Sequence, residues 1–140
     1  MAIKDAVKDW ADRFAPDLAT IEAIAQQAYA NMPAEFRVLT ANVPIYVADF
    51  PHDDIIDDLG LESPFEILGL FEGKGPGGHW TPSQKGNGNK LTLYRRAILD
   101  YWCESDETLH DIITDVILGE LGHHFGLSEL QIADIENAME

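Results

Sequence analysis

Residues 118–129, LGELGHHFGLSE, place a carboxylate and imidazoles at a spacing that suits metal chemistry. In an α-helix, side chains four residues apart lie on the same face, one turn above the other. Two imidazoles at that spacing reach one zinc ion at about 2 Å each. A glutamate next to the first imidazole then serves as general base toward a metal-bound water. Here Glu120 and His123 hold two of these places, but Gly119 stands where the first imidazole belongs.

The residues after His123 extend the same pattern. Gly126 follows three positions later, where a glycine ends a helix in a left-handed turn. The chain then doubles back, so that Glu129 can return toward His123 as a further ligand. The spacing therefore predicts a site with Glu120 as base and His123 and Glu129 as metal ligands, with the ligand position at Gly119 vacant.

Ordinary structural roles explain each of these residues as well. Glu120 on an exposed helix face would be a solvated charge, and His123 would be a cation favoured at a helix C-terminus. Glu129 would be an acid favoured at the start of the next helix, and Gly126 a routine helix-ending glycine. Spacing alone leaves both interpretations open.

A substitute for the missing imidazole is hard to find. Asp115 lies eight residues before His123, about 12 Å along a helix, and His110 lies farther still. His124 points about 100° away from His123. Only His79, in a glycine-rich loop, is free to travel, although an exposed loop histidine is the simpler interpretation.

The elements that must position this site follow from the hydrophobic periodicity. We expect an α+β fold in which helices pack on a small sheet of about three short strands. The whole chain, residues 1–140, is predicted to be one domain, with an extra N-terminal helix within 1–16. Further helices are predicted over 21–32, 95–103, 106–125 (the motif helix) and after Ser128, and a short helix or turn over 53–64. Strands are predicted over 43–48, 66–72 and 90–94, with a glycine-rich loop over 73–89.

The composition of the chain limits the classes of molecule that it is expected to bind. The chain has 25 acidic and 9 basic residues, a net charge of −16, which disfavours nucleic acid and anionic membrane surfaces. Cys103 is the one cysteine, so no intramolecular disulfide forms, and we expect a cytoplasmic protein with Cys103 as a buried thiol. Arg95 and Arg96 are expected to pair with surface carboxylates. The sequence does not predict an oligomeric state.

The motif segment resembles the small bacterial zincin-like metallopeptidases, whose motif runs H-E-[IVL]-G-H-H-F-G-[LF]-[SD]-[DE]. Every position from Glu120 to Glu129 fits, and Gly119 is the departure. The stretches MPAEFR, VADFP, LGLESPFEILGLFEG and LYRRAILDYW are also similar to the family. The resemblance covers residues from about 20 to 138.

This resemblance implies a minimal zincin fold, a zinc cofactor and a peptide or protein substrate. It implies that Glu120 is the general base and that His123 and Glu129 are zinc ligands, while nothing carries over to Gly119. Two hypotheses follow. The chain is either a zinc-dependent peptidase with an impaired metal site, or a catalytically inactive pseudo-peptidase that binds a peptide or protein.

Overall fold

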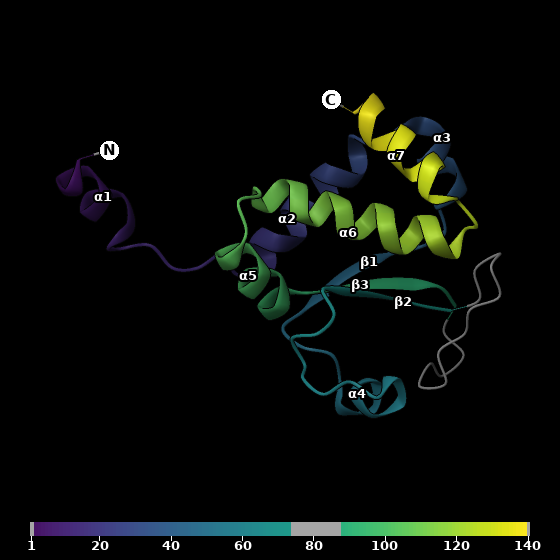
Figure 1. The fold of residues 1–140 in the computed structure, drawn as a ribbon, viewed down its shortest axis with the longest axis horizontal. Coiled ribbons are helices and arrows are strands. Elements are labelled where there is room, and N and C mark those ends of the chain that lie inside the picture. The colour runs from purple at the N-terminus through teal and green to yellow at the C-terminus, as the bar shows by residue number, and fades with distance from the viewer. Residues whose placement is uncertain (1, 74–87, 140) are drawn as a thin grey trace.

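The computed structural model describes residues 2–73 and 88–139, which form seven helices and one three-stranded sheet (Figure 1). This confirms the predicted α+β class. The elements in chain order are α1 (Ile3–Trp10), α2 (Leu18–Ala30), α3 (Ala34–Leu39), β1 (Ile45–Ala48), α4 (Asp53–Leu59), β2 (Gly69–Glu72), β3 (Lys90–Tyr94), α5 (Arg95–Glu104), α6 (Leu109–His124) and α7 (Glu129–Ala138).

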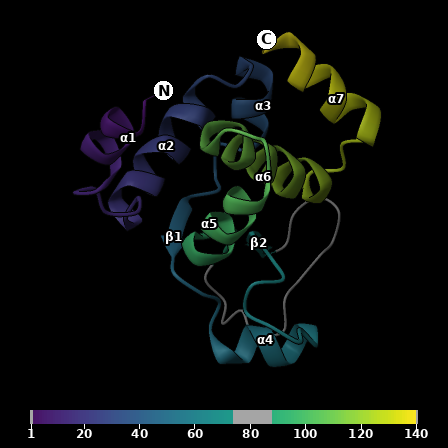
Figure 2. The same cartoon turned by 60° about the vertical axis from the view of Figure 1, so that its left-hand side comes forward.

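The sheet has the strand order β1-β3-β2, with β3 parallel to β1 and antiparallel to β2. Leu91 of β3 is paired with Ile45 on one side and with Phe71 on the other. Because side chains alternate along a strand, Phe71, Leu91 and Leu93 share one face, and all three are buried. Helices α2 and α6 cover this face, whereas α4 lies on the other side of the sheet (Figures 1 and 2).

Helix α6, the predicted motif helix, supplies much of the core. Its apolar side chains at helical spacing are almost completely buried: Ile112, Ile113, Ile117, Leu118 and Leu121. It also lies unusually close to β2. A Cβ atom added at Gly69 would stand only 2.8 Å from Cγ1 of Val116, so the glycine lets the helix sit directly on the strand.

The C-terminal end of α6 is a Schellman motif. Gly126 has a φ of 80°, the Leu127 amide donates to the Gly122 carbonyl at 2.8 Å, and the Gly126 amide donates to the His123 carbonyl at 3.1 Å. Both the end of the helix and the positive φ were predicted. Helix α7 then begins with the predicted capping box, in which Ser128 Oγ accepts from the Gln131 amide and Gln131 Oε1 from the Ser128 amide.

Some boundaries differ from those predicted. Helix α1 ends at Trp10, although apolar spacing continues to Phe14. Helix α3 was not predicted, since six residues are too few to show a helical period. Helix α6 begins at Leu109 rather than 106, because Thr108 Oγ1 accepts from the Asp111 amide and caps the helix there.

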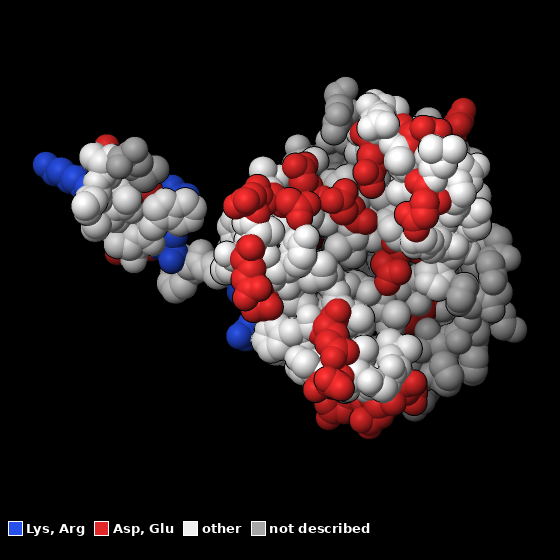
Figure 3. All heavy atoms as spheres, in the orientation of Figure 1, with Lys and Arg blue, Asp and Glu red and all other residues white. Residues whose placement is uncertain are grey.

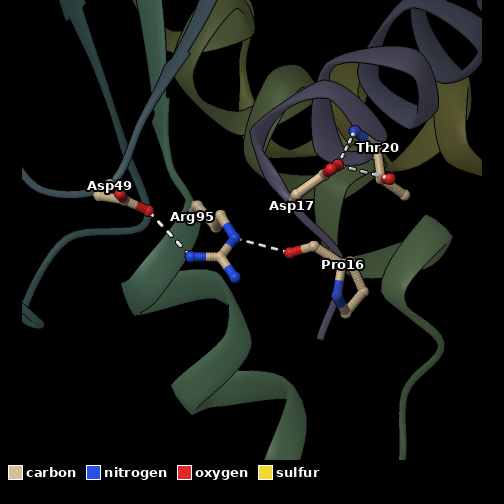
Figure 4. Close-up of polar contacts among 5 residues, drawn as sticks. All are labelled: Pro16, Asp17, Thr20, Asp49 and Arg95. Carbon is tan, nitrogen blue, oxygen red and sulfur yellow. Dashed lines mark hydrogen bonds and ion pairs between the residues drawn. The ribbon is translucent and has the colours of Figure 1, made fainter. Parts of the chain in front are cut away.

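Cys103 and Arg95, at opposite ends of α5, differ in whether the structure agrees with the prediction. Cys103 is exposed, not buried, because α5 turns Ala97 and Ile98 inward and leaves Cys103 on its outer side. Arg95 pairs with a carboxylate as predicted: Nη1 lies 3.0 Å from Oδ1 of Asp49. Its Nε also donates to the Pro16 carbonyl at 2.6 Å, which ties the segment before α2 to the start of α5 (Figure 4).

No helix within 2–73 and 88–139 has both the length and the apolar character that crossing a bilayer requires. The predicted loop over 73–89 lies almost wholly outside these ranges.

The turn at Gly126 leads to a prediction with an internal control. Among the described residues, apart from its chain neighbours and the backbone of its own helix, a Cβ at Gly126 or at Gly119 would meet no atom within 4 Å, so Gly→Ala at either position mainly changes the backbone preference. Gly126→Ala should cost about 1–2 kcal/mol, because its φ is left-handed. Gly119→Ala should instead stabilise by up to about 1 kcal/mol, because residue 119 is helical. Urea unfolding of both variants measures the difference. Equal effects would show that the turn is not constrained as described.

Candidate metal centre

His123 and Glu129, the two predicted ligands, lie in contact. Nε2 of His123 is 3.2 Å from Oε1 of Glu129, and the two side chains are 54% and 84% exposed. His123 stands in the last turn of α6 and Glu129 is the first residue of α7, so the turn at Gly126 brings them together. Both donor atoms are therefore at the surface, where a ligand from solution can reach them.

Glu120 stands three residues before His123 and is partly buried. Burial raises the pKa of its carboxyl group to about 7, and the nearby His123 acts in the opposite direction. A carboxyl group with a pKa near neutral pH is suited to both accepting and returning a proton. The ordinary explanation of Glu120 as a solvated surface charge is therefore wrong.

His124 belongs to the packing of the helix rather than to the pair at His123. Its ring stacks on Phe71 of β2, with ring centroids 4.5 Å apart and an angle of 16° between the planes. Phe125 meets the same Phe71 ring edge to face at 6.1 Å. The two contacts fasten the end of α6 to the sheet and leave His123 pointing toward Glu129.

Two further buried polar residues, Tyr94 and Glu72, were not found from the sequence. The Tyr94 side chain, at the end of β3, is buried, and its pKa is raised first by burial and then by the charges of Glu72 and Glu120. Glu72, the last residue of β2, is also buried. Neither carries a motif of its own, and they come from two strands that pair only in the folded sheet. Tyr94 is therefore a buried polar side chain that the charges of both Glu72 and Glu120 influence.

The other candidate ligands do not join the pair. His110 and Asp115 line a separate cavity of about 280 Å³ together with Glu107 and Glu136. His79 lies outside the described residues. Gly119 offers no donor atom, and no described side chain fills the space beside its Cα.

The donors that these residues supply can be compared with the ligands that a catalytic zinc ion requires. Zinc in hydrolases is held by three protein ligands and keeps one open position. Within 2–73 and 88–139, no three His, Cys, Asp or Glu side chains are grouped so that they hold a metal ion. His123 and Glu129 supply two donors, so the described residues do not complete a catalytic zinc site.

The buried carboxyl group of Glu120 leads to a prediction on pH. Its folded-state pKa, about 7, lies above the usual value of 4.5, so it contributes stability that is fully present below about pH 4.5 and is lost as the pH rises through 7. Glu120→Gln removes this dependence. In metal-free protein, the unfolding free energy of the variant minus that of the unchanged protein should rise by about 3 kcal/mol between pH 4.5 and 8. Urea titrations with a chelator present measure it. A difference that stays constant with pH would contradict the burial of a titrating carboxyl group.

Comparison with known proteins agrees with the motif. Residues 40–139 match the zincin-like metallopeptidase family, for which zinc is the typical metal. The match begins after α3, later than the resemblance from about residue 20, and it includes the sheet, α6 and α7. No curated protein matches the chain. Since the match spans well over half of the sequence, the chain belongs to the zincin-like metallopeptidase family.

Proposed function

We propose that this chain keeps the frame of a zincin peptide-hydrolysing site but is impaired as a zinc peptidase at Gly119. One observation carries the proposal: His123 and Glu129 stand 3.2 Å apart, while the position one turn earlier has no side chain. The turn supports the proposal by bringing the two side chains that we propose as donors together, whereas residue 119 supplies no side chain.

The energetic consequence of the missing donor is large. Loss of a residue that merely supports a ligand lowers metal affinity about 10–100-fold, so loss of a ligand itself should lower it further. The other parts of a hydrolytic site persist. Glu120, with a pKa near 7, suits a base that takes a proton and passes it to a leaving amine. The substrate class is a peptide or a protein, as for the family.

A second candidate function is peptide or protein binding without hydrolysis. The observation in its favour is that the turn, the capping box and the packing of Phe71 on His124 are all present beside His123 and Glu129, the two donors that the described residues supply. A surface held in this way can bind a peptide whether or not a metal ion is present. The two candidates differ in whether bound peptide is cleaved.

Restoring the imidazole tests the proposal. The helix places residue 119 one turn from His123, and the space beside Gly119 is open, so Gly119→His should bind zinc tightly. At a hundredfold excess of zinc over its Kd, the variant should gain about 2.7 kcal/mol of unfolding free energy. Gly119→Ala is the matched control, because it removes the same helical glycine without adding a donor. Calorimetric titration and zinc-dependent melting measure both variants.

Equal zinc affinity of the unchanged protein and Gly119→His would show that Gly119 is not a lost ligand. Free imidazole should raise the zinc affinity of the unchanged protein but not that of Gly119→His.

Peptide turnover then separates the two functions. Gly119→His should cleave a peptide mixture, and adding Glu120→Gln should abolish cleavage while leaving zinc binding in place. If Gly119→His binds zinc and peptide but never cleaves, the binding function is the correct one.

A further inference from the structure

A cavity rich in carboxylates lies between the first half of α6 and the end of α7, apart from the candidate metal centre. Its volume is about 280 Å³, and the acidic residues that line it are Glu107, Asp111, Asp115 and Glu136. Asp111 and Asp115 are four residues apart on α6, so both project from the same side of the helix. Acidic side chains gather on the face of the molecule that carries α6 and α7 (Figure 3). Negative charge is therefore concentrated around this cavity.

Basic side chains of the described chain do not offset this charge, apart from His110. No Lys or Arg of 2–73 and 88–139 forms an ion pair with any of the four acids, and His110 Nδ1 lies 3.4 Å from Asp111 Oδ1. Burial raises the pKa of the Asp115 carboxyl group, and the charges of Glu136 and the other two acids raise it further. The carboxylates thus repel one another, and a cation bound among them would relieve that repulsion.

Thr114 brings an unpaired hydroxyl group to the same cavity. It lies one helical turn after His110 and is one of the residues that line the cavity. The residue is only 7% exposed, and its Oγ1 atom has no hydrogen-bond partner among the described residues. A buried hydroxyl group without a partner lowers the stability of the folded state. A threonine in a helix populates two χ1 rotamers, so rotation turns the hydroxyl group toward a ligand in the cavity.

The groups around the cavity match an organic cation better than a metal ion. A metal ion needs its ligands at about 2.0–2.6 Å from one point, and the described His, Cys, Asp and Glu side chains are not grouped in that way. An ammonium group instead has three N–H donors and no acceptor, so it pairs with carboxylate and hydroxyl oxygens. Met139, which also lines the cavity, offers an apolar contact for a methylene chain.

We propose that this cavity binds the ammonium group of an alkylamine, either a free polyamine or the lysine side chain of a protein. The cavity has room for several water molecules of about 30 Å³ each, and therefore for an ammonium group with a short alkyl chain. Asp115 lies eight residues before His123, about 12 Å along α6. A bound amine consequently leaves His123 and Glu129 free, and the site does not depend on whether the chain binds zinc.

Calorimetric titration of the full chain tests the proposal with two primary amines. A free polyamine is represented by 1,5-diaminopentane, and a lysine side chain by N-acetyl-lysine methylamide. The control for each is its trimethylammonium analogue, which keeps the charge but has no N–H group to donate. At least one amine should bind saturably, on the order of tenfold or more tightly than its analogue, because only the amine forms hydrogen bonds. The amine that binds more tightly identifies the source of the ammonium group.

Carboxylate variants locate the bound amine. Asp111→Asn combined with Asp115→Asn should weaken binding on the order of tenfold or more, since it removes two charged acceptors. Asp54→Asn combined with Asp58→Asn on α4 is the matched control. Those two residues are exposed, have the same four-residue spacing and change the net charge equally. This control should leave the affinity nearly unchanged, and circular dichroism should show both double variants folded.

Thr114→Val tests the hydroxyl group separately. The substitution keeps the shape of the side chain and should lower the affinity for the amine on the order of tenfold. Without ligand it should raise the midpoint of urea unfolding, because it removes a buried hydroxyl group that has no partner. A purely structural role would change the midpoint and leave the affinity unaltered.

Three results would overturn the proposal. They are the absence of saturable binding of both amines, equal affinity for the amines and their trimethylammonium analogues, and equal loss of affinity in the two double variants.

Discussion

The geometry of the candidate centre depends on one backbone constraint, the left-handed conformation of Gly126. Two amide bonds close the turn over the end of α6, from Leu127 to Gly122 and from Gly126 to His123. They reverse the chain within three residues, and the Ser128 cap starts α7 in a fixed direction. Glu129 consequently reaches His123 from a different helix. Without a positive φ at this point, α6 would continue and carry residue 129 away from His123.

Much of this arrangement was predictable because it rests on local chemistry. Cap residues, a helix-ending glycine and a strong apolar period are visible in the sequence, so α6, α7 and β3 were found close to their true limits. The parts that were missed depend on contacts between distant segments. Tyr94 and Glu72 lie on strands that pair only in the folded sheet, and Cys103 is exposed because of how α5 faces the sheet. The role of Gly69 was also missed, because a side chain at this position is excluded only by the close approach of Val116 from α6.

The end of α6 combines features that do not favour folding. A partly buried carboxyl group at Glu120 disfavours the folded state at neutral pH, and a glycine within a helix costs about 1 kcal/mol relative to alanine. The stabilising features at the same place, Phe71 against His124 and the capped turn, hold this arrangement in position. The capped turn and the contact of Phe71 with His124 are thus present beside Gly119, which has no side chain to offer as a ligand.

The bonds of the Arg95 side chain mark where the N-terminal segment joins the rest of the fold. Its guanidinium group joins three segments that are remote in sequence, through the Pro16 carbonyl, the Asp49 carboxylate and its own place at the start of α5. Its side chain is only 18% exposed, and the bond to the Pro16 carbonyl is partly buried. No residue from Ala2 to Ala15 is buried, so the segment before Pro16 contributes little to the packing of the core. Insertions, fusion partners or purification tags placed there should leave the folding of the remainder unaffected, which makes this the natural attachment point for a label or a surface tether.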